Sequence, residues 1–124
     1  MIKNKLQTIL YIKDMASEVH FYRDVLGLSV QYPAVMSDYA GEMWVEFKLG
    51  ESSLALHGGA QDTPNDLHEV VFWVEDIYQV RKTILDAGFK INEIRTLEDG
   101  ALIAEGRDPE GHRIAIRTTL NNYD

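Results

Sequence analysis

Residues 8–30 read TILYIKDMASEVHFYRDVLGLSV, and residues 70–91 read VVFWVEDIYQVRKTILDAGFKI. When Asp14 is aligned with Asp76, each stretch becomes an apolar strand, an Asp, an amphipathic helix, a Gly and a second apolar strand. The likeness continues, since GEMWVEF from Gly41 corresponds to GALIAEG from Gly100. The chain is therefore predicted to contain a duplicated unit of about sixty residues, and function is sought on surfaces that the two halves can share.

The composition is that of an ordinary globular protein. The 124 residues are 45% hydrophobic and 26% charged, which suits one domain with a real core. No apolar run is long enough to span a membrane, and the N-terminus lacks the pattern of a signal peptide. The absence of cysteine excludes disulfides and suits a cytoplasmic protein. A formal net charge of −8 argues against nucleic acid as a partner and agrees with a cationic ligand.

The first module, about 1–58, is predicted to be a strand, a helix and three more strands. Asp14 can cap a helix whose apolar residues recur at helical spacing, and Gly27 suits the left-handed position that ends it. The predicted strands are at 6–12, 28–35, 43–49 and 52–57, and the last two form a hairpin.

The second module, about 68–119, repeats this plan after a linker at 59–67 that is rich in turn-forming residues. Asp76 caps its helix and Gly88 ends it. Its predicted strands are at 69–74, 90–97, 101–106 and 112–118. The predicted fold class is α+β, with two tandem βαβββ modules that form curved mixed sheets around a cleft and carry their helices on the outer faces.

In each module one face of the sheet is expected to lie under the helix and the other to be open. The open face is predicted to mix apolar and polar residues, which is typical of a ligand cleft. The residues predicted on it are Gln7, Ile9, Tyr11, Ala55 and His57 in the first module, and Glu69, Val71, Trp73, Arg113, Ala115 and Arg117 in the second.

The sequence resembles the vicinal oxygen chelate superfamily, which includes glyoxalase I, bleomycin resistance proteins, fosfomycin resistance proteins and extradiol dioxygenases. The resemblance covers almost the whole chain and implies a homodimer whose modules pair within or between chains. The segments that carry it are QTILYIKDM and FYRDVLGL within 7–28, LALH at 54–57, VVFWVEDI at 70–77 and DPEGHRIAI at 108–116.

Members of this superfamily usually hold a divalent metal with four side chains, one from each of four strands. The resemblance places those positions at Gln7, Ala55, Glu69 and Ala115. Glutamine is an accepted ligand at the first position, and Glu69 stands where a histidine is usual. Because alanine has no donor atom, two of the four ligands are missing, and no metal or other cofactor is expected.

A rebuilt metal site is the alternative. One histidine is expected on the open face, a second would reach it if a bulge shifted its strand, and a glutamate recurs in both repeats. These residues are His57, His68, Glu46 and Glu105. A site made of Gln7, His57 and Glu69 is chemically possible, while the plainer interpretation is that both histidines are solvated at strand ends.

Glu69 beside Trp73 is the candidate catalytic residue, because an apolar cleft would raise the pKa of its carboxyl and suit it to act as a general base. The alternative is an ion pair with Arg113 or Arg117. These arginines could instead clamp an anionic substrate, or extend along the rim and cover apolar surface.

Three aromatic residues, Tyr11, Trp44 and Trp73, could stack on a planar or cationic ligand, or could simply pack within the sheets. His112, in the turn that begins at Asp108, is predicted to be structural.

The leading functional hypothesis is metal-independent binding of a small organic molecule, as in the bleomycin resistance proteins that the sequence resembles. It is motivated by a retained fold with alanine at two ligand positions. The alternative is an enzyme, either a glyoxalase-like lyase or a dioxygenase with a rebuilt metal site, or a metal-free isomerase that uses Glu69. A third hypothesis is a structural or regulatory dimer without a ligand.

Overall fold

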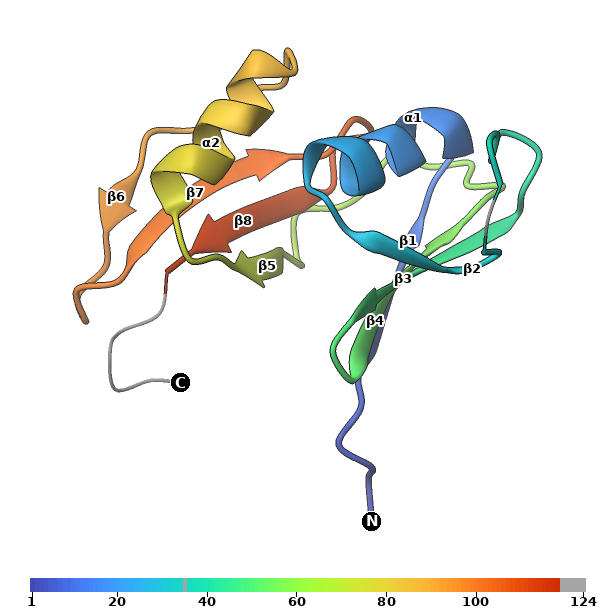
Figure 1. Cartoon of the computed structure of the whole chain (residues 1–124), viewed down its shortest axis with the longest axis horizontal. Helices are drawn as coiled ribbons and strands as arrows, with labels where there is room; N and C mark the ends of the chain where they lie inside the picture. The colour runs from blue at the N-terminus through green and yellow to red at the C-terminus, as the bar shows by residue number, and fades with distance from the viewer. Residues whose placement is uncertain (35, 119–124) are drawn as a thin grey trace. The chain divides into compact units, whose positions relative to one another are not determined.

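The computed structural model describes residues 1–34 and 36–118, and in it the chain forms two compact units. Unit 1 is Met1–Pro64, and unit 2 begins at Asn65. Each unit contains a four-stranded mixed sheet and a helix in the order βαβββ (Figure 1), which confirms the predicted α+β class. Val35 in the strand predicted at 28–35, and residue 119 at the end of the second predicted module, lie outside the described residues.

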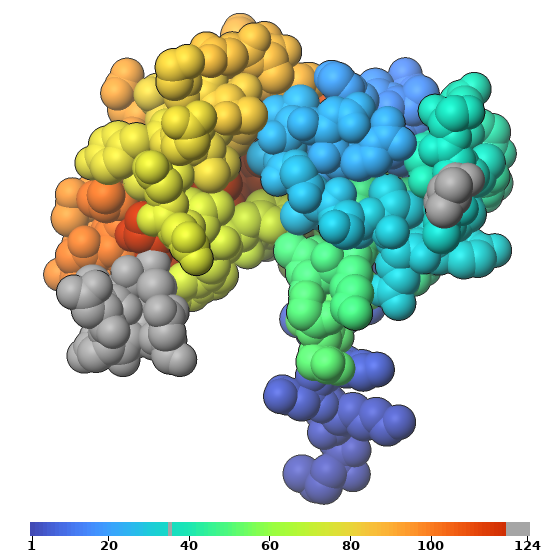
Figure 2. Space-filling view, viewed as in Figure 1, coloured from blue at the N-terminus to red at the C-terminus, as the bar shows by residue number. Residues whose placement is uncertain are grey.

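Unit 1 begins with an exposed segment, Met1–Leu6, that extends beyond the sheet (Figure 2). Its strands are ordered β1-β4-β3-β2, with β1 parallel to β4 and the other pairs antiparallel. The elements are β1 (Gln7–Tyr11), α1 (Met15–Val19), the π-helical η1 (His20–Val25), β2 (Ser29–Tyr32), β3 (Trp44–Leu49) and β4 (Ser52–His57).

The helix of unit 1 starts and stops where its sequence predicts. The Asp14 carboxylate accepts a hydrogen bond from the Ser17 N–H at 3.2 Å, and Gly27 has a φ of 79°. The helix widens in its second half, where the Leu26 N–H donates to the Phe21 carbonyl five residues earlier. Sequence periodicity did not reveal this widening.

Unit 2 repeats the arrangement with strand order β5-β8-β7-β6, and β5 is parallel to β8. The Asp76 carboxylate accepts from the Gln79 N–H at 3.1 Å and caps the helix. The elements are β5 (Val70–Trp73), α2 (Ile77–Asp86), β6 (Arg95–Thr96), β7 (Leu102–Arg107) and β8 (Arg113–Arg117).

The strand predicted at 90–97 is much shorter than expected. Within 90–97, only β6 and a single bridge between Ile91 and Gly106 pair with β7. The Asn92 N–H still donates to the Glu105 carbonyl, but the Asn92 carbonyl accepts from the Arg81 side chain at 2.9 Å. Because a side chain from α2 takes that carbonyl, the regular ladder of hydrogen bonds is interrupted there.

The buried faces of both sheets carry the aliphatic residues that alternation predicts. Leu54 and Leu56 of β4 are buried, as are Ile114 and Ile116 of β8. In unit 1 the Tyr22 ring lies 6.1 Å from the Phe47 ring, which joins the helix to β3. In the part of the chain that the structure describes, no helix has both the length and the apolar character needed to cross a membrane.

Gly106 lets the segment around Ile91 lie directly against β7. A Cβ at Gly106 would stand 3.1 Å from the Lys90 carbonyl oxygen and 3.4 Å from the Ile91 Cα. We expect Gly106→Ala to lower the free energy of unfolding by about 1–3 kcal/mol, because backbone atoms must shift. Urea unfolding followed by circular dichroism measures this. Gly41→Ala is the matched control, since a Cβ there meets nothing within 4 Å. An equal loss in both variants would contradict the prediction.

Candidate functional site

The strand register gives the two open faces the same central row. Each row holds an aliphatic residue on the first strand, an alanine on the last and a glutamate on the strand beside it. The rows are Ile9, Ala55 and Glu46 in unit 1, and Val71, Ala115 and Glu105 in unit 2. In both units a carboxylate therefore stands directly opposite the alanine.

Unit 1 carries a row of rings next to its central row. Tyr11 pairs with His57, and His57 pairs with Trp44. The His57 ring lies 5.2 Å from the Tyr11 ring and 6.0 Å from the Trp44 ring. Hydrogen bonds orient two of the rings, from Trp44 Nε1 to Glu46 Oε1 at 3.3 Å and between His57 Nδ1 and the Gly58 carbonyl at 2.8 Å. The sheet thus presents an aromatic row of fixed orientation.

Gln7 lies at the other end of this face. Its side-chain amide donates to the Ser53 hydroxyl at 2.9 Å. Unit 1 therefore brings together the predicted residues Tyr11, Trp44 and His57, and leaves Gln7 paired with the neighbouring strand.

Unit 2 contains a cleft of about 940 Å³ at the edge of its sheet. Glu69 and Arg113 are the sequence-predicted ligand-binding residues that line it. Its other charged and apolar walls come from α2 and its following loop, from β7 and from the turn after β7. These residues are Leu85, Phe89, Lys90, Ile91, Glu105, Arg107, Asp108 and Pro109. A cleft of this size and mixed character suits a small organic molecule.

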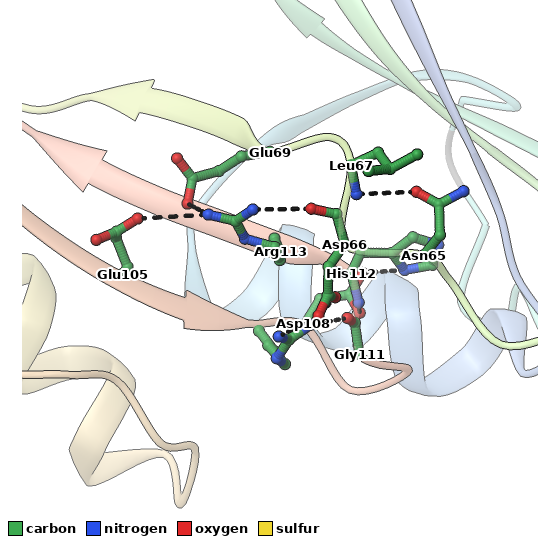
Figure 3. A network of polar contacts seen from close by, with 10 residues as sticks. Asn65, Asp66, Leu67, Glu69, Glu105, Asp108, Gly111, His112 and Arg113 are labelled. Carbon is green, nitrogen blue, oxygen red and sulfur yellow. Dashed lines mark hydrogen bonds and ion pairs between the residues drawn. The ribbon is translucent and has the colours of Figure 1, made fainter.

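One guanidinium connects two carboxylates inside the cleft (Figure 3). Arg113 Nη2 donates to Glu69 Oε2 at 3.2 Å and lies 3.7 Å from Glu105 Oε2. Arg95 Nη2 donates to Glu105 Oε1 at 2.8 Å. The predicted alternative of an ion pair between Glu69 and Arg113 is therefore present, and Arg117 takes no part in it.

The pKa values of the two carboxyl groups in this network are shifted in opposite directions. Burial raises the pKa of Glu69 above its ordinary value of 4.5, a hydrogen bond with Glu105 raises it further, and Arg113 opposes both. The hydrogen bond from Arg95 is the largest cause that lowers the pKa of Glu105. The raised pKa keeps Glu69 a candidate for proton transfer.

Asp66 ties this network to the segment before β5. Its carboxylate accepts from Arg107 Nη1 at 2.7 Å and Nη2 at 3.1 Å, and its backbone carbonyl accepts from Arg113 Nη1 at 2.9 Å. Sequence analysis missed Asp66 and Arg107, because the first lies in a turn-rich linker and the second carries no motif. The register of β7 and β8 pairs Arg107 with Arg113, and the hydrogen bonds of Asp66 then join it to both arginines.

The other residues predicted for unit 2 lie outside the cleft lining. Arg117 stacks over the Trp73 ring, with Cζ 4.2 Å from its centroid, and approaches Asp99 at 3.7 Å. Val71 and Trp73 are exposed on the open face. His68 is exposed, and β5 pairs with β8 without a shift in register from Val70 onward. No bulge in the described part of β5 turns His68 toward the open face.

The turn after β7 is organised around a buried aspartate. Asp108 Oδ1 accepts from the Glu110 and His112 N–H groups, each at 3.0 Å, and Oδ2 lies 2.8 Å from His112 Nδ1. The Gly111 N–H donates to the Asp108 carbonyl, and Gly111 has a φ of 97°. This geometry agrees with the structural role predicted for His112.

Comparison with known proteins places the whole arrangement in one family. Residues 6–116 match the model of the Glyoxalase/Bleomycin resistance protein/Dioxygenase superfamily. The chain belongs to this superfamily. A Synechocystis protein described as a "Probable lactoylglutathione lyase" is 28% identical to it, over 96% of this chain and 98% of the relative.

Solved structures of glyoxalase superfamily proteins share the fold. A lactoylglutathione lyase from Agrobacterium tumefaciens superposes with a TM-score of 0.72 at 21% identity and covers 96% of both chains. A glyoxalase/dioxygenase from Nostoc punctiforme gives a TM-score of 0.74 at 20% identity, over 93% of this chain and 90% of that one. At these identities the likeness establishes the fold.

The metal that the glyoxalase superfamily implies does not fit the residues at its four usual ligand positions, Gln7, Ala55, Glu69 and Ala115. Ala55 and Ala115 are fully buried in their sheets and offer no ligand atom. Gln7 is hydrogen bonded to Ser53, and Glu69 is paired with Arg113. Each unit, taken by itself, thus retains one of its two family ligand positions, and hard divalent ions need more oxygen or nitrogen donors than that.

The raised pKa of Glu69 predicts a specific pH dependence. A carboxyl whose pKa rises on folding contributes stability below its ordinary pKa of 4.5, and this contribution is lost as the pH rises through the folded value. We expect the unfolding free energy of the native chain, relative to Glu69→Gln, to fall from pH 4 toward pH 7. Urea unfolding at several pH values measures this. Exposed Glu75, changed to Gln, is the control. A difference that grew with pH would contradict the prediction.

Proposed function

We propose that this chain binds a small organic molecule in the cleft of unit 2, and that it does so without the four-ligand metal site of its superfamily. The observation that carries the proposal is the presence of buried alanine at two family ligand positions, one in each sheet. Membership of the superfamily supports a small-molecule ligand. The cleft supports it too, because both apolar residues, Leu85 and Phe89 among them, and a small set of oriented polar groups line it.

The aromatic row of unit 1 is a separate surface from the cleft, and planar or cationic molecules are the class to test on it. The rings of Tyr11, His57 and Trp44 follow one another across three strands, and Tyr11 is 59% exposed. Ring faces held in this way bind flat molecules and cations. The superfamily resemblance also supports a homodimer, for which light scattering with size-exclusion chromatography gives the mass.

A second candidate function is a glyoxalase-like lyase with a rebuilt metal site. It is favoured by the relative that is described as a "Probable lactoylglutathione lyase" and that matches nearly the whole chain. Glu46 and Glu105, directly opposite the two alanines, are the carboxylates that such a site would use first. Metal affinity separates the two candidates.

Calorimetric titration of chelator-stripped protein with Zn²⁺, Ni²⁺, Mn²⁺ and anaerobic Fe²⁺ makes that measurement. We expect no stoichiometric binding at micromolar or tighter affinity, because only two of the four family ligand positions, Gln7 and Glu69, still carry a donor atom. The double variant Ala55→Glu, Ala115→Glu restores the two missing carboxylates and serves as the positive control. Tight stoichiometric binding to the native chain would overturn the metal-independent proposal and favour the lyase.

A fragment screen monitored by amide NMR shifts tests the cleft itself. We expect planar and cationic fragments to shift the signals of Phe89, Ile91 and Glu105, because these residues line the cleft. Phe89→Ala removes one apolar wall and should weaken binding by roughly tenfold. Leu49→Ala, at the end of β3 in unit 1, is the control. Fragments that shift only residues of unit 1 would contradict the placement of the ligand.

A further inference from the structure

Several cationic side chains line the cleft of unit 2, but not all of them are available to bind a ligand. Arg107, Arg113 and Lys90 line it and by composition would suit an anion. Guanidinium groups, however, bind an anionic ligand strongly only when their forked donors are available to it. The partners of the two arginines therefore decide what the cleft accepts.

Both forks are already engaged by the protein. Arg107 points both terminal nitrogens at the Asp66 carboxylate, and its Nη1 also donates to the Gly111 carbonyl at 3.0 Å. Arg113 gives Nη1 to the Asp66 carbonyl and Nη2 to Glu69. One residue, Asp66, thus occupies donors of both arginines, through its side chain in one case and its backbone in the other.

Local structure holds Asp66 in this position (Figure 3). The Leu67 N–H donates to the Asn65 side-chain oxygen at 3.0 Å, which forms a tight turn with Asp66 at its centre. The bidentate pair with Arg107 then fixes the turn against the end of β7. Because these contacts place the Asp66 carbonyl at Arg113, the side chain of Asp66 orients a guanidinium that it does not itself touch.

The exposure of this pair argues against a purely structural role. The side chains of Arg107 and Asp66 are 50% and 63% exposed. Ion pairs at such exposure contribute little to folding stability. Their bidentate geometry is nevertheless specific, and Arg107 is one of the residues that line the cleft.

We propose that Asp66 is a specificity-determining residue, which by occupying the donors of Arg107 and Arg113 makes the cleft reject anions and accept neutral or cationic organic ligands. The inference rests on the proposed binding function and narrows its ligand class. Glu69 and Glu105 complete the selection, since they leave carboxylate oxygens facing the cleft around Arg113.

Inorganic phosphate is the probe that tests this, in titrations followed by NMR at constant ionic strength. We expect Asp66→Asn to bind phosphate roughly tenfold tighter than the native chain, which is the effect of about one released charge-assisted hydrogen bond. The gain should disappear in the double variant Asp66→Asn, Arg107→Gln. Asp62→Asn removes the same charge from the same linker and should leave phosphate affinity unchanged.

A second measurement reports the arginines directly. In ¹⁵N spectra of the guanidinium groups at low temperature, Arg107 and Arg113 should give separate, slowly exchanging Nη signals in the native chain and in Asp62→Asn. These signals should merge in Asp66→Asn. If Asp66→Asn folds poorly, Asp66→Ser takes its place, and the same merging is expected.

Equal phosphate affinity in the native chain and Asp66→Asn would overturn the proposal, as would guanidinium signals that Asp66→Asn leaves unchanged. Neither experiment uses the natural ligand. A failed fragment screen therefore counts against the binding function, and a failed phosphate titration counts against the role of Asp66.

Discussion

In each unit the first strand pairs in parallel with the last, and the rest of the structure depends on this pairing. Parallel neighbours cannot be joined by a tight turn, so the chain must cross over between β1 and the hairpin that ends in β4, and again between β5 and β8. The helix supplies part of that connection and covers one face of the sheet. The other face stays open, and strand alternation decides which residues it carries.

The duplication then places equal residues at equal positions of that open face. Both sheets carry an alanine in the last strand and a glutamate opposite it. In unit 2 the positive charge next to Glu69 comes from the Arg113 side chain. The superfamily's usual arrangement puts a metal ion next to this position. A fixed guanidinium satisfies the carboxylate without offering the open coordination position that metal chemistry needs.

The linker before β5 shows how a segment without a motif can take part in a site. Its composition predicts a turn, and the structure contains one at Asn65–Leu67. That turn also delivers Asp66 to two arginines from neighbouring strands. The site in unit 2 thus combines residues from a linker, from two strands and from the loop that follows α2, and each part depends on the others for its orientation.

The sequence by itself determined the duplicated βαβββ plan, because capping aspartates, terminal glycines and alternating strands are local signals. Asp14, Asp76, Gly27 and Gly88 all occupy the roles that their positions predict. It also determined which face of each strand is open, and so placed Glu69, Arg113 and Arg117 on one face, while the structure selected Arg113 as the partner of Glu69. Register and turn geometry, however, depend on contacts between distant residues. Only the tertiary structure therefore shows that Glu105 lies opposite Ala115 and that Asp66 pairs with Arg107. It also shows that the strand predicted at 90–97 is short, where the Arg81 side chain donates to the Asn92 carbonyl.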